Sequence, residues 1–409
     1  FMNTSTSPLD FDIIIAGGGM IGMSMALAIA PLNLRIAVVE KVHRDQVQQP
    51  SFDDRSTALS RSSQSMYQAL GLWDEILSAS TPIKSIHVSD RGKFGFSHIN
   101  AEEQKVEALG YVVINRILGE VLMRHTELKE NVSFYCPAEV TSITYQKDCY
   151  SVVLDSKKKL SCKLLVGADG ANSKVREYLG IGVTQTDYEQ VAIIGNLVTE
   201  KPIMNRAYER FSESGPVALL PVQDNRTAFI WVVPKDQKKK LLELEDEAFI
   251  SAIQEVFGSR LGEFKQLGGR TSYPLLLSEV PRLHANRGVI IGNAANALHP
   301  VAAQGFNLGL RDVATLADCL SEVKDNHDIG STDMLLDYSE WRQNDQKKLR
   351  IFTDNLVKLF GSNKKSIQIL RNISMVGFDL VPGFRKFFVR HTMGLAGKLP
   401  RLSRGIALK

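Results

Sequence analysis

Three glycines near the amino terminus have the spacing of a loop that binds phosphate groups. Gly17, Gly19 and Gly22 fit the pattern G-x-G-x-x-G and follow the apolar, strand-like residues 13–15. In this pattern the first glycine makes a tight turn, the second lets the backbone approach a pyrophosphate, and the third allows a helix to pack closely on a strand. The N-terminus of that helix carries a partial positive charge that favours phosphates. The spacing predicts a dinucleotide site, and by itself it fits FAD and NAD equally.

A carboxylate follows this glycine motif at the distance that such a site requires. Residues 35–39 read as a second strand, and Glu40 stands at its end, 18 residues after Gly22. A carboxylate in that position can accept hydrogen bonds from both hydroxyl groups of a ribose. The order strand, glycine turn, helix, strand and acid favours a bound dinucleotide over a glycine-rich turn without a ligand.

A second polar turn follows another buried strand. Residues 164–168 are apolar, and Asp169 and Gly170 come directly after them. Ligands of open α/β sheets bind at the carboxyl ends of strands, so this turn is a candidate for the same site. The alternative is an ordinary β-turn, for which Asp-Gly is a common sequence.

Two arginines occupy places from which they could reach a bound cofactor. Arg55 precedes a helix that we expect to run to about Leu70, and Arg116 lies where a strand-like stretch becomes helical. Each arginine could fold back onto cofactor phosphates or into a cleft. The alternative for both is a solvated side chain at the surface.

A second glycine-spaced segment lies far downstream of the first. Residues 292–312 read GNAANALHPVAAQGFNLGLRD and follow the buried strand 287–291. We expect a helix from Asn307 to about Leu320, so that residues 301–307 form a loop that feeds its N-terminus. The free N–H groups of a helix start suit an anionic ligand. Two ligands fit: a second phosphate, or the pyrimidine edge of a flavin, which becomes anionic when the ring is reduced.

Composition limits the kind of protein to which these motifs belong. The chain has 409 residues, 44% hydrophobic and 23% charged, as is ordinary for a soluble globular protein of two or three domains. A net charge of +4 gives no reason to expect nucleic acid as a partner, and four scattered cysteines without a CxxC pair predict no metal site. Residues 13–34 are uncharged, but their three consecutive glycines and Pro31 oppose a transmembrane helix. A reducing cytoplasm is the expected compartment.

The motifs are spread over a chain whose middle has a different character. Residues 188–234 contain short β-rich runs separated by turn residues, which is typical of an antiparallel sheet. The expected fold class is α/β, with a discontinuous Rossmann-like nucleotide-binding domain, an inserted antiparallel β-sheet domain for the substrate, and a C-terminal helical tail. The expected boundaries are residues 1–74, 105–182 and 283–362 for the first domain, 75–104 and 183–282 for the second, and 363–409 for the tail.

The carboxyl-terminal segment is strongly basic. Residues 364–409 hold ten Lys or Arg residues against one acid, Asp379, which gives a net charge of +9. One interpretation is a helix packed on its own domain with its basic side chains in solvent. The other is a surface that docks on an anionic membrane or an acidic protein, with phenylalanines entering the interface.

The order of these motifs resembles that of the single-component flavin aromatic hydroxylases, the 4-hydroxybenzoate hydroxylase-like monooxygenases. The shared features are the first glycine loop with Glu40, then Asp169-Gly170, then Gly292 and P-x-x-x-Q-G-x-N-L-G at residues 300–309. The segments GNAANALHPVAAQGFNLGLRD, LGYVVINR and YERFSESGPVALLPV are similar to the ubiquinone-biosynthesis hydroxylases, above all the 2-polyprenyl-6-methoxyphenol hydroxylases. The wider family usually has Asp, which contacts the flavin ribityl chain, where this chain has Asn293; that subgroup also reads Gly-Asn.

The resemblance implies a cofactor and a reaction. FAD would place its ADP half on the first loop and its ribityl chain and isoalloxazine on the second. NAD(P)H would act as a transient co-substrate, and O2 would hydroxylate a polyprenyl phenol, a 2-polyprenyl-6-methoxyphenol, through a flavin C4a-hydroperoxide in ubiquinone biosynthesis. Two alternatives remain: a flavin-dependent lipid reductase or dehydrogenase that inserts no oxygen, and a non-catalytic carrier or assembly subunit on the same fold.

The resemblance also bears on location and on individual residues. A polyprenyl substrate implies a cytoplasmic protein peripheral to the inner membrane, with residues 364–409 docking on the membrane or on other ubiquinone-biosynthesis proteins. The catalytic residues are not assigned, although His299 and Pro300 are candidates near the flavin face. His299 either bonds the substrate phenol or is packed without a catalytic role. The expected cofactor-binding residues are Gly17, Gly19, Met20, Ile21, Gly22, Glu40, Lys41, Arg55, Arg116, Val140, Asp169, Gly170, Gly292, Asn293, Pro300, Gln304, Gly305, Phe306 and Asn307.

Overall fold

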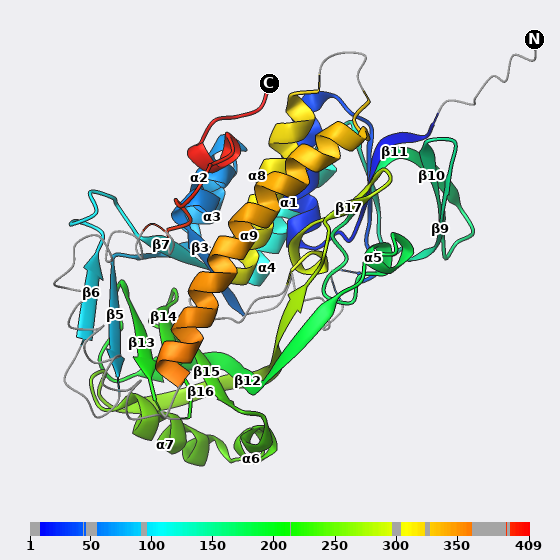
Figure 1. Ribbon diagram of the computed structural model, residues 1–409. Coiled ribbons are helices and arrows are strands. Elements are labelled where there is room, and N and C mark those ends of the chain that lie inside the picture. The colour runs from blue at the N-terminus through cyan, green and yellow to red at the C-terminus, as the bar shows by residue number, and fades with distance from the viewer. Residues whose placement is uncertain are drawn as a thin grey trace, which may run out of the picture.

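A computed structural model shows that the chain is organised around two large β-sheets (Figure 1). One sheet has eight strands and carries the glycine loops, and the other has seven. A third, smaller sheet has three strands. The structure describes residues 9–43, 45, 55–90, 96–212, 214–296, 304–323, 328–361, 390 and 393–409.

The eight-stranded sheet brings the ends of distant strands to one edge. Its strands are β1 (Phe11–Ala16), β2 (Ile36–Val39), β8 (Val132–Tyr135), β9 (Val140–Gln146), β10 (Cys149–Leu154), β11 (Lys159–Gly167), β17 (His284–Ala285) and β18 (Gly288–Ile290). Strand β1 pairs in parallel with both β2 and β11, and β11 pairs in parallel with β18. The loops after these strands therefore meet at the carboxyl edge, where open α/β sheets bind their ligands.

Helices with apolar faces cover this sheet. Helix α1 (Met20–Ile29) is apolar over most of its circumference, and eight of its ten residues are buried. It packs against both α4 (Asn115–Glu127) and α8 (Gln304–Ser321), and α9 (Thr332–Gly361) packs on α8 (Figure 1). The remaining helices of this part are the short α3 (Trp73–Ser78) and α5 (Lys174–Tyr178) and the nine-residue α2 (Arg61–Ala69).

We expected a helix directly after Arg55, but the helix begins at Arg61, six residues after Arg55. Residues Ser56–Ser60 form strand β3, which pairs antiparallel with β7 (Gly110–Ile114); β7 also pairs with β4 (Ser80–Ile83). Helix α2 starts at Arg61, and the Ser60 side chain caps it by accepting the N–H of Ser63. Ser and Thr have a lower helix propensity than Ala or Leu. Pairing with β7 therefore stabilises this stretch as a strand.

The seven-stranded sheet has one face on helices and one face toward the nucleotide-binding part. Its strand order is β16–β12–β15–β14–β13–β5–β6. Helix α7 (Asp246–Phe257) packs on the outer face, near the short α6 (Lys238–Leu242) (Figure 1). The strands span Ser85–Asp90 (β5), Phe96–Asn100 (β6), Thr184–Thr199 (β12), Arg206–Phe211 (β13), Val217–Pro221 (β14), Thr227–Pro234 (β15) and Phe264–Glu279 (β16). The division into domains at residues 75–104 and 183–282 stays a prediction.

The last residues of the chain are packed on the nucleotide-binding part. Leu402 and Leu408 are buried in the main core, Arg401 forms an ion pair with Asp318 of α8, and the indole N–H of Trp341 donates to the carbonyl of Lys398. Of the two interpretations of the basic segment, residues 393–409 therefore agree with packing on its own domain, although they form turns and a short 3-10 helix rather than a long helix. Most of residues 364–392 lie outside the described residues. In the described part of the chain, no helix has both the length and the apolar character needed to cross a bilayer.

Candidate cofactor site

The turn after β1 and the turn after β11 are in contact. Gly17 has a φ of +103°, and a Cβ placed on it would lie 2.3 Å from the carbonyl oxygen of Ala168. Glycine is therefore required here both by the backbone conformation and by space. The contact places the Gly17 turn next to Asp169 and Gly170, two motifs that are 150 residues apart in the sequence.

The second glycine-spaced segment rests on the first turn of α1. A Cβ on Gly292 would lie 3.2 Å from the Ile21 side chain, and a Cβ on Gly309 would lie 2.8 Å from it. A Cβ on Gly22 would lie 1.8 Å from the carbonyl oxygen of Gly17. These glycines let α1, α8 and the turn after β18 approach one another, so all three sequence motifs border one site.

The start of α1 has the properties of a phosphate site. Gly19 is its N-cap residue, with no side-chain cap and no acidic residue in the first turn. The backbone N–H groups of a first helical turn have no partner within the helix. A pyrophosphate fits this end of the helix because it satisfies those donors and matches the positive end of the helix dipole.

Glu40 is buried and held in one orientation. One carboxylate oxygen accepts the N–H of Gly18 at 2.6 Å, and the other accepts the N–H of Val42 at 2.8 Å. A carboxylate offers about four acceptor positions, so bonding these two amides is compatible with accepting ribose hydroxyl groups as well. The position after β2 and the fixed carboxylate fit the ADP half of FAD.

Asp169 shapes its own turn. Its carboxylate accepts the hydroxyl of Ser173, and it also accepts the N–H of Val175 at 3.1 Å. Gly170 follows with a φ of +83°, and a Cβ on it would meet no other atom within 4 Å. The side chain of Asp169 thus holds the turn, while Gly170 faces open space.

Arg176 joins two of the loops, and the sequence did not identify it as a site residue. Its buried guanidinium donates to the carbonyl of Ala294 at 3.0 Å and to that of Ala171 at 2.9 Å. The first acceptor lies in the turn after β18 and the second in the turn after β11. Both acceptors are backbone carbonyls, so no residue type in the sequence could have indicated this contact.

The turn after β18 presents polar side chains toward the site. It forms a short 3-10 helix, η4 (Gly292–Ala294), in which Asn293 is exposed. The amide nitrogen of the Asn296 side chain is buried and has no hydrogen-bond partner in the described part of the chain. The exposed Asn293 side chain and the buried Asn296 amide nitrogen, which has no partner among the described residues, suit the hydroxyl and carbonyl groups of a ribityl chain and a flavin ring.

Helix α8 begins three residues earlier than expected and places Gly305 in its first turn. A Cβ on Gly305 would meet no atom of the described residues within 4 Å. Asn307 is instead committed to the protein: its side chain accepts the N–H of Ser60 at 2.8 Å and donates to the carbonyl of Ala58 at 2.8 Å. Its side chain thus fixes α8 against β3, so only its backbone could contribute to cofactor binding. His299, Pro300, Ala303 and the side chain of Gln304 lie outside the described residues.

Several other expected residues have partners of their own. Arg116 is exposed and pairs with Glu120 at 3.3 Å, and Lys41 pairs with Glu139 at 3.0 Å. The Arg55 guanidinium stands 4.9 Å from the centre of the Tyr273 ring. Of the remaining three, Val140 is buried in the main core, and Met20 and Phe306 are half-buried against it.

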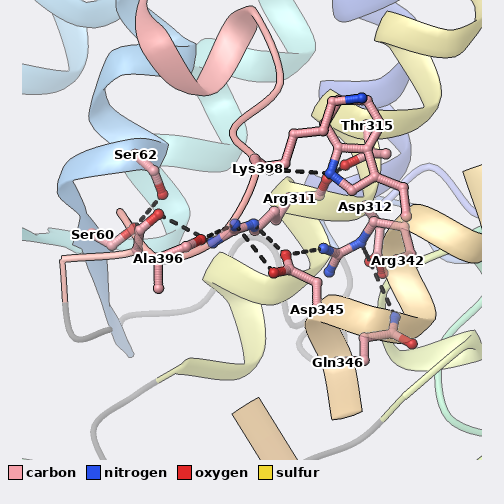
Figure 2. A network of polar contacts seen from close by, with 12 residues as sticks. Ser60, Ser62, Arg311, Asp312, Thr315, Arg342, Asp345, Gln346, Ala396 and Lys398 are labelled. Atoms are coloured by element: carbon pink, nitrogen blue, oxygen red, sulfur yellow. Dashed lines mark hydrogen bonds and ion pairs between the residues drawn. The ribbon is translucent and has the colours of Figure 1, made fainter. Parts of the chain in front are cut away.

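A buried network of ion pairs connects α8 to α9 and to the carboxyl-terminal segment (Figure 2). Asp312 accepts the N–H of Gly292 at 2.9 Å and the Arg342 guanidinium at 2.7 Å. Asp345 lies 2.6 Å from both Arg342 and Arg311. Arg311 also donates to backbone carbonyls of the carboxyl-terminal segment, that of Ala396 among them.

Burial and ion pairing oppose each other in this network: burial acts to lower the pKa of Arg342, but pairing with Asp312 and Asp345 raises it overall. Burial raises the pKa of the Asp312 carboxyl above its usual range, although the neighbouring Arg342 guanidinium acts in the opposite direction. Burial likewise lowers the pKa of Arg311 to about 10, against the effect of Asp345. The charges are therefore held by their mutual pairing, and the pairing fixes the second loop through Gly292.

Asn293→Asp is expected to keep the fold and to change the behaviour of the flavin. Asn293 is exposed, and Asp has the same size, so the free energy of unfolding should change by less than about 0.5 kcal/mol. A negative charge beside the flavin opposes its anionic reduced form, so the reduction potential of bound FAD should fall. Anaerobic titration of flavin absorbance with a reference dye measures this; unfolding of the variant would mean that Asn293 is structural.

Comparison with known proteins identifies the family of the chain. The FAD binding domain family matches residues 10–352. The chain is similar to ubiquinone hydroxylase UbiL of Rhodospirillum rubrum, with 33% identity over 97% of this chain and 93% of that protein. It is also similar to 3-demethoxyubiquinol 3-hydroxylase of Escherichia coli, with 28% identity over 94% and 98%.

The fold has solved counterparts. The structure of p-nitrophenol 4-monooxygenase PnpA from Pseudomonas putida superposes with a TM-score of 0.78 over 95% of this chain and 98% of that one, at 15% identity. At this identity the likeness shows the fold. With the family match and the full-length similarity to UbiL, it gives one conclusion: the chain belongs to the FAD-binding domain family and is one of its FAD-dependent aromatic hydroxylases.

Proposed function

We propose that this protein uses NAD(P)H and O2 to hydroxylate a polyprenyl phenol in ubiquinone biosynthesis, with a 2-polyprenyl-6-methoxyphenol as the substrate. The observation that carries the proposal is the similarity, over nearly the whole chain, to proteins named for ubiquinone hydroxylation. The two glycine-spaced loops and the Asp169-Gly170 turn also support it, because they border one site and a molecule as long as FAD requires separate loops for its two halves.

The residues of this chain have distinct tasks in such a reaction. Bound FAD supplies the redox chemistry, taking electrons from NAD(P)H and passing them to O2. The first turn of α1 binds the pyrophosphate, and Glu40 orients the ribose. The N-terminus of α8 would supply backbone N–H groups to the flavin ring, and these donors would favour its anionic reduced state.

The seven-stranded sheet has the task of excluding water. Its inner face carries apolar side chains that pack together on β12, β15 and β16, including those of Ala192, Val232 and Leu275. An apolar cover limits the water that reaches the reacting flavin and strengthens the electrostatic interactions beneath it. Docking of basic residues 364–409 on the membrane, as the route of a membrane-borne substrate, stays a prediction of the sequence; most of residues 364–392 lie outside the described residues.

Isotope labelling distinguishes the three possible functions. The purified protein is supplied with FAD, NAD(P)H, 18O2 and a short-chain 2-polyprenyl-6-methoxyphenol, and the product is weighed by mass spectrometry. A hydroxylase incorporates one 18O atom into the ring. A flavin-dependent reductase consumes NAD(P)H and places no 18O in the product, and a carrier protein does neither. Either of the last two results would refute the proposal.

A further inference from the structure

Glu209 lies on the face of the seven-stranded sheet that is turned toward the nucleotide-binding part. Side chains alternate along β13. Tyr208 points outward, where its ring centre lies 5.7 Å from that of Phe257 in α7. Ala207 points inward and packs with Ile83 and Val112 of the three-stranded sheet. Glu209 follows Ala207 by two residues and therefore shares the inward face.

The neighbours of Glu209 on this face are apolar. Its direct partners are Val88 on β5 and Ala218 on β14. The row continues through Ile230 on β15 and Ile194 on β12. Burying a carboxylate among apolar side chains costs folding free energy, because the charged group loses its hydration. Residues that carry such a cost are found most often at functional sites.

At its β16 edge, the same face contacts the nucleotide-binding part. Tyr273 of β16 pairs with Ala192, which packs with Val232 on the inward face. The Arg55 guanidinium stands over the Tyr273 ring, and β3 leads from Arg55 to Ser60, whose N–H is bonded to the side chain of Asn307 in α8. At its β16 edge, the sheet face that carries Glu209 is thus linked through Arg55 and β3 to the first turns of α8.

No described charged group compensates Glu209 from this side. Its partners on the neighbouring strands, Val88 of β5 and Ala218 of β14, are uncharged. The arginines of its own strand, Arg206 and Arg210, alternate to the outer face. Burial raises the pKa of the Glu209 carboxyl to about 7. A general base is most effective when its pKa lies near the working pH, so this environment suits proton transfer near neutrality.

We propose that Glu209 accepts the proton of the substrate's phenolic hydroxyl group. The O–H bond of the phenol breaks, a new O–H bond forms on a carboxylate oxygen of Glu209, and the electron pair stays on the substrate oxygen. The resulting phenolate enriches the ring carbons ortho and para to it, which is where an electrophilic oxygen is inserted. No oxidation occurs in this step, and the proton returns when the product is released. This inference rests on the proposed function, since it requires a phenol.

The Glu209→Gln variant tests the proposal. Glutamine has the same shape and accepts hydrogen bonds, but it cannot take up the proton. Wild-type hydroxylation should rise with pH and level off above about pH 7, because the carboxylate is the active form. The variant should lose about 100-fold in rate at pH 7 and recover about tenfold per pH unit toward the pKa of a free phenol near 10. FAD content and flavin reduction by NAD(P)H should not change.

The Glu209→Gln variant should fold, so a loss of hydroxylation rate can be assigned to the missing carboxylate rather than to unfolding. Folding raises the pKa of Glu209, so its ionisation destabilises the fold as pH rises from its unfolded value through about 7. An uncharged glutamine removes that effect and should fold at least as well at pH 8. Glu209→Asp should keep the wild-type form of the pH profile at a reduced rate, and Glu189→Gln, at an exposed position of β12, is the matched control.

The outcomes separate the two levels of inference. If Glu209→Gln hydroxylates with the wild-type pH profile, Glu209 is not the proton acceptor and the inference is wrong, while the proposed function stands. If the wild type itself hydroxylates no polyprenyl phenol, the proposed function fails and the inference fails with it.

Discussion

Gly305→Val should fold normally and bind FAD at least tenfold more weakly. A Cβ at this position would meet no atom of the described residues within 4 Å, so packing within the described part of the chain does not require a glycine here. Its place in the first turn of α8 means that added methyl groups enter the space left for the flavin. A tenfold loss corresponds to about 1.4 kcal/mol of binding free energy. Quenching of flavin fluorescence during titration of the apoprotein measures the dissociation constant.

Gly309→Val is the matched control on the same helix. Its Cβ would lie 2.8 Å from Ile21 and 3.3 Å from the Cα of Gly292, so this glycine serves packing between α8, α1 and the second loop. Overpacking of this kind lowers the free energy of unfolding by about 1–3 kcal/mol. Denaturation of the two apoproteins should thus separate them. Equal flavin affinity for Gly305→Val and wild type would mean that the first turn of α8 does not face the cofactor.

Asp345→Ala is expected to give the largest loss of stability, about 3–5 kcal/mol of unfolding free energy. Its carboxylate lies 2.6 Å from both Arg311 and Arg342, which are largely or fully buried, so removing it leaves two guanidinium groups without their shared partner. Urea denaturation followed by circular dichroism measures the effect. Adding Arg311→Met to the variant should restore part of the loss, because it removes one of the stranded charges.

An exposed ion pair provides the comparison for Asp345. Lys239 and Glu243 lie 3.9 Å apart with both side chains mostly in solvent, and Glu243→Ala should change the free energy of unfolding by less than about 1 kcal/mol. If Asp345→Ala were no more harmful than Glu243→Ala, the buried network would contribute little, and the position of Gly292 would depend on other contacts.

The features that could be predicted from the sequence are those encoded over short distances. The first glycine loop and Glu40 fall within one strand–helix–strand unit of about thirty residues, where spacing alone fixes the geometry. The features that could not be predicted depend on partners far away in the chain. Arg176 acts through the carbonyl of Ala294, 118 residues away, and the side chain of Asn307 is bonded to residues near position 60.

Local preference also misled the sequence analysis in one place. Residues Ser56–Ser60 precede a helix and contain no strong strand former apart from Thr57, so a helix start was the natural prediction. Their pairing with β7, fifty residues downstream, made them a strand. Glu209 lies in the segment YERFSESGPVALLPV, which carried part of the family resemblance, but the resemblance gave this residue no role, and its apolar surroundings became visible only when the register of four strands was known.

The contacts of Arg311 have a consequence for the order of events during synthesis. Its carbonyl partners, Gly394 and Ala396, follow it in the chain by 83 and 85 residues. A ribosome adds about 5–20 residues per second, so α8 emerges several seconds before these partners exist. Until then the helix that completes the flavin site lacks part of its support. Flavin capture should therefore come late, after the carboxyl-terminal segment has docked, and a nascent chain arrested before residue 394 should bind little flavin.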